Sequence, residues 1–310
     1  MNQHTPSGRQ LTGLALALFT SYTWATIPII LKILVQWVDV YTLTWFRFLV
    51  AGLLLVPLVL RAQGGFARIL RLRGAPLLLL LLAAVGLCGN YQTYMSGLRF
   101  LSPATGQVIM QISPLLVMLG GLLVFGEVFS RLQWLGFVTL IAGQVLFFYP
   151  RYSDLLDLSG AYALGVFLVF LSALLWALYM LMQKQLLVFI APEAALCAIY
   201  FFGAAVVLPI AQPAKVVELN GMLLLLLVLS SVLTMVSYLS FGKALERVEA
   251  SRVGVIIALM PLITALNMEL VTSAFPQAPL EPEQVTLMGM AGAALVVVGG
   301  VLGVLGRRTG

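Results

Sequence analysis

Ten long apolar stretches follow one another along the chain, with short polar segments between them. Each stretch is about twenty residues long, which is the length of helix that crosses ~30 Å of hydrocarbon. The pattern therefore predicts ten transmembrane helices joined by short loops. The stretches cover approximately residues 11–34, 41–60, 75–97, 103–126, 132–149, 159–182, 193–211, 220–242, 252–275 and 284–305.

Landmark residues of the first half return in the same order in the second half. The pairs are Trp24 and Trp176, Lys32 and Lys184, Pro57 and Pro209, Tyr91 and Tyr238, Leu98 and Leu245, Pro114 and Pro261, Gly136 and Gly292, and Gly143 and Gly299. Five stretches in each half is an odd number, so the second half must enter the membrane from the opposite side. Secondary transporters are often built from such repeats and bind substrate between them.

We therefore predict an all-α membrane protein with ten transmembrane helices in two inverted five-helix repeats around a central cavity. The repeats are expected at residues 11–150 and 159–306, after a cytoplasmic tail of residues 1–10. Hydrophobic residues make up 62% of the chain and charged residues 9%, with a mean hydropathy of +1.07. This composition places the chain in a lipid bilayer. The short loops leave no room for a domain that binds nucleotides or nucleic acid.

The distribution of basic residues predicts the orientation, because cytoplasmic loops accumulate Lys and Arg. With the N-terminus inside, the cytoplasmic set is Arg9, Arg61, Arg68, Arg71, Arg73, Arg131, Lys184, Lys243, Arg247, Arg252, Arg307 and Arg308. The opposite side then holds only Arg99, Arg151 and Lys215. Both termini are therefore expected in the cytoplasm, and the net charge of +6 is a consequence of topology.

A set of landmarks in the first half resembles a known superfamily. They are Trp24-Ala25, Lys32, Arg47-Phe48, Ala51-Gly52, Gly97-Leu98, Pro114-Leu115, Gly126-Glu127, Gln133, Gly136 and Gly143. Together they are similar to the drug/metabolite transporter superfamily, in particular to its ten-span members built from two EamA-type domains. The second half departs from the pattern, since Ile199 stands where Arg47 would repeat and Ala274 where Glu127 would.

The resemblance implies a ten-helix bundle whose central cavity opens alternately to either side of the membrane. It also implies that the substrates are small metabolites, amino acids or drugs. The expected location is the bacterial inner (plasma) membrane.

Polar and aromatic residues recur at helical spacing within the apolar stretches, and such residues turn away from lipid. The predicted cavity residues are Tyr22, Trp24, Arg47, Asn90, Tyr91, Tyr94, Gln107, Gln111, Trp176, Tyr179, Thr234 and Tyr238. The alternative for each is a hydrogen bond between helices with no role in binding. For Arg47 the alternatives are a structural pairing with carbonyls or a carboxylate, and attraction of a substrate carboxylate or phosphate.

Three further residues invite hypotheses about movement and coupling. Pro114 and Pro261 occupy equivalent places in the fourth and ninth stretches, where a proline removes a backbone hydrogen bond. They are candidate hinges. Glu269 is a lone carboxyl in the ninth stretch, with Leu122 at the equivalent place of the first half. It is a candidate for carrying a coupling proton, and the alternative is a buried structural carboxylate.

The leading hypothesis is a secondary transporter that exports small metabolites such as amino acids by alternating access, coupled to protons. The alternatives are an exchanger or uniporter that needs no gradient, and a membrane-embedded enzyme or scaffold without transport. The sequence has no Gly-x-x-x-x-Gly-Lys-Ser/Thr loop for ATP and no His-Glu-x-x-His zinc motif. No cofactor or metal is therefore expected, and we do not expect an enzyme.

Overall fold

The structure is a computed structural model that describes residues 10–61, 65–125, 130–156, 160–245, 247, 253, 256–277, 280 and 286–305. Residues 1–9 of the predicted tail, the landmark Glu127 and residues 252, 254 and 255 at the start of the ninth stretch lie outside the described residues. So do the side chains of Pro114 and Lys184. All secondary structure in the described part of the chain is helical.

Six described helices are long and apolar enough to cross a membrane. They are α1 (Gln10–Leu34), α2 (Val40–Arg61), α4 (Ala75–Leu98), α7 (Arg131–Phe148), α9 (Ala161–Leu186) and α12 (Gly221–Leu245). The other helices of the bundle are α5 (Pro103–Met110), α6 (Ile112–Phe125), α10 (Pro192–Val207), α14 (Met260–Ala274) and α15 (Leu287–Leu305). Short helical segments in the connections are α3 (Gly65–Leu70), the 3₁₀ turn Tyr149–Arg151, α8 (Tyr152–Leu156) and α11 (Ala214–Val217).

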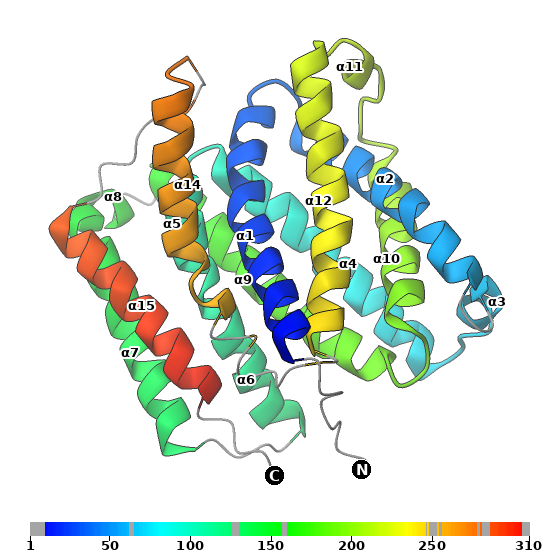
Figure 1. Ribbon diagram of the computed structural model, residues 1–310, viewed down its shortest axis with the longest axis horizontal. Coiled ribbons are helices and arrows are strands. Elements are labelled where there is room, and N and C mark those ends of the chain that lie inside the picture. The colour runs from blue at the N-terminus through cyan, green and yellow to red at the C-terminus, as the bar shows by residue number, and fades with distance from the viewer. Residues whose placement is uncertain are drawn as a thin grey trace.

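The main helix pairs each combine one helix from either half of the chain. These pairs are α1 with α12, α2 with α10, α4 with α9, and α7 with α15. In Figure 1, α12, α1 and α14 lie next to one another across the front, and α7 and α15 run together at the lower left. The apolar core therefore lies between the two halves, and neither half packs as a separate bundle.

Equivalent residues of the two halves make equivalent hydrogen bonds. The hydroxyl of Thr20 donates to the carbonyl of Ser237 (3.4 Å), and the hydroxyl of Ser172 donates to the carbonyl of Asn90 (3.2 Å). Ser172 follows Thr20 by 152 residues and Ser237 follows Asn90 by 147, which are the spacings of the sequence repeat. The contact between α1 and α12 thus recurs between α9 and α4.

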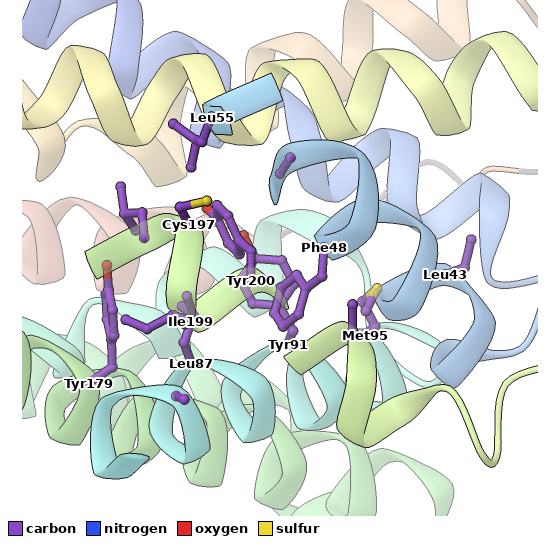
Figure 2. Packing of buried hydrophobic residues seen from close by; sticks show 14 of the residues in the cluster. Leu43, Phe48, Leu55, Leu87, Tyr91, Met95, Tyr179, Cys197, Ile199 and Tyr200 are labelled. Carbon is purple, nitrogen blue, oxygen red and sulfur yellow. The ribbon is translucent and has the colours of Figure 1, made fainter. Parts of the chain in front are cut away.

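Two further contacts join a residue to its own repeat partner. The rings of Phe48 and Tyr200, which are 152 residues apart, pack with centroids 5.2 Å apart. Figure 2 shows them together with Tyr91 in the apolar cluster. The side-chain amide of Gln111 donates to the carbonyl of Ala258, 147 residues later, over 3.2 Å. Contacts of this kind arise where a twofold relation between the halves has its axis.

Glycines allow α7 and α15 to pack backbone against backbone. A Cβ atom on Gly136 would lie 2.3 Å from the backbone nitrogen of Gly303, and one on Gly292 would lie 2.4 Å from that of Phe147. Because the spacing between Gly136 and Gly292 equals that between Phe147 and Gly303, these two contacts are also equivalent. Small residues at such crossings are typical of helices that pack within membranes.

Regular helix is interrupted close to both candidate hinge prolines. The fourth stretch is interrupted at Gln111 between α5 and α6, and Pro114 is the third residue of α6. In the ninth stretch residues 258 and 259 form a turn, and Pro261 lies in the first turn of α14. Proline has no N–H, so each proline removes the helical donor for the carbonyl four residues earlier, close to the break.

Candidate functional site

A cavity of about 160 Å³ lies in the centre of the bundle and is lined by both halves of the chain. Ten of the predicted site residues line it: Trp24, Arg47, Asn90, Tyr91, Tyr94, Gln107, Gln111, Trp176, Thr234 and Tyr238. The breaks before Pro114 and Pro261 also reach this cavity, through Met110, Gln111 and Met260. The predicted polar positions and both helix breaks therefore meet at one place.

Arg47 places a charge in the cavity wall. Its side chain is only 2% exposed, although α2 begins seven residues earlier, so it faces the interior and does not reach the membrane surface. Its Nη2 donates to the Thr234 hydroxyl over 2.6 Å, and Nη1 lies 3.8 Å from the sulfur of Met95. The guanidinium carbon is 4.8 Å from the centre of the Tyr91 ring, within the range of a cation–π contact.

Aromatic rings from both halves form the rest of the wall near Arg47. Trp24 packs against Tyr238 and Phe241, with ring centroids 5.2 and 5.3 Å apart. Trp176 and Tyr91, which are the repeat partners of Trp24 and Tyr238, line the same cavity. The cavity therefore offers broad apolar faces with hydroxyl and indole groups at their edges.

Three predicted polar residues are occupied in bonds between helices. Asn90 donates to both the carbonyl and the hydroxyl of Ser172, over 3.0 and 2.7 Å. Gln107 donates to the carbonyl of Trp24 over 3.0 Å. That carbonyl needs a partner because Pro28, four residues later in α1, has no N–H to donate. The side-chain amide of Gln111 donates to the carbonyl of Ala258. These three amide groups therefore donate to other helices, which was the alternative to a role in binding.

Polar atoms of three other lining residues have no partner. The Nε of Arg47, the hydroxyl of Tyr94 and the hydroxyl of Ser113 are buried without a hydrogen bond. Since buried polar groups are almost always hydrogen-bonded, such atoms in a cavity wall mark places where a ligand can bind. The lining residues in the described part of the chain include no Asp, Glu, His or Cys.

Two predicted cavity residues lie elsewhere. Tyr22 is 57% exposed and continues an outward-facing stripe with Leu18 and Phe19, one turn earlier in α1. Tyr179 is fully buried but does not line the cavity, and it packs behind Tyr238 with ring centroids 6.2 Å apart. Tyr22 was therefore wrongly placed in the wall, and Tyr179 supports the wall from behind.

Glu269 is not buried. The buried residues of α14 are Pro261, Thr264, Asn267 and Met268, and its hydrogen bonds to α1 come from Thr264 and Asn267. Glu269 points away from this stripe and is exposed, about 7.5 Å along the helix axis from the end of α14 at Ala274. The alternative of a buried structural carboxylate was therefore wrong, because no helix in the described part of the chain covers this face of α14.

The apolar part of the wall was not predicted. It consists of Ile27, Pro28, Leu31, Met95, Met110, Phe241, Ile257 and Met260. Several of these positions continue predicted stripes, since Pro28 follows Trp24 by one turn and Met95 follows Tyr91 by one turn. Extending each polar stripe by helical spacing would have found them.

A larger groove of about 610 Å³ lies to one side of the bundle, lined by α5, α6, α7, α8 and α9. Its lining is almost wholly apolar, and the amide of its Gln144 is taken by the carbonyl of Val108 over 2.6 Å. Several of its residues, including Val145 and Phe167, are strongly exposed. We therefore consider the smaller central cavity to be the candidate site.

Comparisons with known proteins agree with this architecture. The chain is 31% identical over 297 residues to YhbE of Escherichia coli K12, an uncharacterized inner membrane transporter, covering 96% of this chain and 92% of that protein. It is 28% identical over 298 residues to an uncharacterized transporter of Haemophilus influenzae, covering 96% of both chains. One crystal structure aligns with a TM-score of 0.63 at 19% identity, over 96% of this chain and 99% of the other, and shows the same fold.

The model of the EamA-like transporter family matches the chain twice, at residues 11–149 and 163–305. The two matches are consistent with a duplicated domain and together include the residues that line the central cavity. This chain belongs to the EamA-like transporter family and is a multi-pass helical membrane protein.

Proposed function

We propose that the protein is a secondary transporter that exports small metabolites such as amino acids by alternating access. The observation that carries this proposal is the central cavity, which both halves line in a member of a transporter family. Its wall is mostly aromatic and apolar with a few polar groups, as is typical of sites for small molecules. The relatives named as inner membrane transporters favour the same location here.

The proposed architecture has ten spans in two inverted repeats, residues 11–150 and 159–306. The matching contacts Thr20 to Ser237 and Ser172 to Asn90 support it, as do the contacts between repeat partners. The two broken segments support it further, since they occupy equivalent places and border the cavity. Interrupted helices at the midplane site are a recurring feature of transporters built from inverted repeats.

The proposed orientation has both termini in the cytoplasm. In Figure 1 the beginning of α1 and the end of α15 lie on the same side of the bundle, at the bottom. The start of α7 and the end of α12 lie on that side too. In the sequence these helix ends carry the basic residues Arg131 and Lys243. The positive-inside rule therefore favours the cytoplasm for this face.

The hinge and coupling roles stay predictions. Pro114 and Pro261 lie close to the breaks. At such a break a helix can change direction with the loss of few backbone hydrogen bonds. Glu269 would have to exchange its proton at the periphery of α14, since it lies outside the cavity. A transporter without proton coupling is therefore the main alternative. A membrane enzyme is less favoured, because the described lining has no carboxylate, imidazole or thiol for acid, base or nucleophile.

The test is a substrate screen with purified protein in proteoliposomes. Mixed amino acids and other small metabolites would be offered under two imposed pH gradients of opposite direction, and uptake would be compared with protein-free vesicles. We expect saturable accumulation of a subset of amino acids that reverses with the gradient. Accumulation that is equal under both gradients would favour an exchanger or uniporter, and absence of any uptake would contradict the proposed function.

A further inference from the structure

We propose that Arg47 binds the carboxylate of the substrate, and that the transported compounds are small monocarboxylates with an apolar body. Amino acids with aliphatic or aromatic side chains belong to this class. This inference rests on the proposed function and adds the chemical group by which the same cavity recognises its substrate. Three observations support it: the charge of Arg47, the unpartnered Nε of its guanidinium, and the aromatic and apolar side chains of the rest of the cavity wall.

The charge of Arg47 is buried without a countercharge in the described cavity wall. The groups in contact with it are a hydroxyl, a thioether and a phenol ring, from Thr234, Met95 and Tyr91. An arginine keeps its charge in proteins, and a buried charge is costly unless an opposite charge and hydrogen bonds compensate it. An anionic group in the cavity would supply both. A cationic substrate would be repelled from the same wall.

The hydrogen bonding of Arg47 leaves donors for such a group. The Thr234 hydroxyl donates its own hydrogen to the carbonyl of Ser230 over 2.7 Å, so its oxygen accepts from Nη2 of Arg47. This pairing fixes the guanidinium on α12. The Nε donor has no partner, and a guanidinium offers parallel N–H groups that match the two oxygens of a carboxylate. Arg47 is thus held by its bond to Thr234 and a weak bond to the Met95 sulfur, and its Nε is left to donate to a ligand.

Arg47 has no charged repeat partner, although the aromatic side chains around it are matched between the halves. Trp24 and Tyr91 are matched by Trp176 and Tyr238, whereas the partner of Arg47 is the fully buried Ile199. Among the described lining residues Arg47 is therefore the single charged side chain, and it is surrounded by a large aromatic and aliphatic surface. One carboxylate neutralises that point, and the remaining surface favours an apolar body.

The first experiment compares four probes on the wild-type protein in detergent by isothermal titration calorimetry. Leucine and 4-methylpentanoate carry the carboxylate, whereas leucinamide and 4-methylpentanamide replace it with an amide of the same shape. We expect both carboxylates to bind and both amides to bind about tenfold or more weakly, as for loss of a charged hydrogen-bonding partner. The corresponding four compounds derived from alanine and from phenylalanine would be measured in parallel, so that a preference for one side-chain size does not determine the result.

Equal affinity for leucinamide and leucine would overturn the proposal, and so would failure of the carboxylates of all three sizes to bind. The screen in proteoliposomes separates this failure from failure of the proposed function. If uncharged or cationic metabolites are transported instead, the transporter assignment stands and the role of Arg47 is wrong. If no metabolite is transported, both are wrong.

The second experiment uses Arg47→Gln and Arg47→Lys, with Arg99→Gln as the matched control that removes a charge from an exposed helix end. We expect Arg47→Gln to bind leucine and leucinamide within about twofold of each other, and Arg47→Lys to keep part of the preference as a point charge. Arg99→Gln should keep it fully. Folding would be checked by size-exclusion chromatography. Unchanged preference for leucine in folded Arg47→Gln would overturn the proposal, and if that variant does not fold, Arg47→Lys and the wild-type comparison decide.

Discussion

Lys32 joins the C-terminal ends of α1 and α4, because its ammonium group donates to carbonyls at the end of α4. Its Nζ donates to the carbonyls of Leu98 and Leu101 over 2.6 and 2.9 Å, at the end of α4. The last carbonyls of a helix lack partners within the helix and carry partial negative charge. Lys32 therefore anchors α1 to the end of α4.

We expect Lys32→Met to lower stability by roughly 1–3 kcal/mol, because it removes charge-assisted hydrogen bonds from a helix end. The methionine keeps most of the side-chain length and apolar contact. Lys215→Met in the exposed segment α11 is the control. Thermal unfolding of the purified proteins in detergent would measure the difference. Equal midpoints for the two variants would show that the contacts of Lys32 contribute nothing.

A second prediction at this scale concerns Glu269. If it carries the coupling proton, Glu269→Gln abolishes accumulation driven by a pH gradient, because an amide cannot release a proton, while exchange of substrate persists. Substrate affinity should stay within about twofold of wild type, since Glu269 does not line the cavity. Proteoliposome uptake and counterflow measure the two activities. If Glu269→Gln still accumulated substrate to the wild-type level under a pH gradient, Glu269 would not carry the coupling proton.

The cavity residues could be predicted from sequence where a polar group has no reason to face lipid. Gln107 and Tyr91 are such cases, because amides and phenols in an apolar stretch turn inward. Tyr22 was misplaced because a phenol ring is apolar enough to lie on the outward face of a helix, and in the middle of α1 it does so beside Leu18 and Phe19. Met95 and Ile27 could not be recognised by composition, because an apolar wall and a lipid-facing surface use the same side chains.

The helix breaks around Gln111 and before Pro261 set the shape of the site. Proline signals a weakened backbone in the sequence, yet the signal does not say whether the helix bends or stops. Here α5 ends at Met110, and Gln111 bonds to the equivalent break through Ala258. Whether a stretch stays continuous depends on such contacts between distant segments, which is why single long helices were expected in these two places.

We expect Pro114→Ala and Pro261→Ala to keep the protein folded in membranes and to slow transport. Alanine restores a backbone donor and favours a continuous helix, so one access state would be stabilised over the other. Initial rates of counterflow in proteoliposomes would measure the effect at equal protein density. Pro209→Ala, in an exposed turn after α10, is the control and should leave the rate unchanged. Wild-type rates in both hinge variants would show that the prolines serve packing alone.

The interface of α7 with α15 gives a prediction at the scale of elements. Gly136→Ala should destabilise the protein by about 1–3 kcal/mol, because the new methyl group would meet the backbone of Gly303. Gly242→Ala in α12 is the control, since a Cβ there meets no atom within 4 Å. It should stabilise by up to about 1 kcal/mol through helix propensity. Thermal unfolding in detergent compares them, and an equal loss in both would contradict the close packing.

At the scale of the whole molecule, the halves are interleaved. The main pairs take one helix from each half, so a repeat folded alone would expose the faces that α12, α10, α9 and α15 cover. The sequence predicted a duplication through recurring residues such as Trp24 and Trp176. Composition alone could not predict which helices pair, because apolar stretches of similar length can pack against one another in many combinations. The observed pairs are specified by particular contacts, such as the hydrogen bond from Asn90 to Ser172.

The proposed inverted arrangement predicts a membrane topology that can be tested without knowing the substrate. Reporter fusions after Arg73 and at the end of the chain should report the cytoplasm, and a fusion after Asp154 should report the other side. Each half contributes five spans, so equivalent positions of the two halves lie on opposite sides of the membrane. The loop after the second span is expected in the cytoplasm, because it carries the basic residues Arg61, Arg68, Arg71 and Arg73. Paired alkaline phosphatase and green fluorescent protein fusions would measure the location, since each is active on only one side. If the fusions after Arg73 and Asp154 reported the same side, an even number of spans would separate them and the two halves could not be inverted copies.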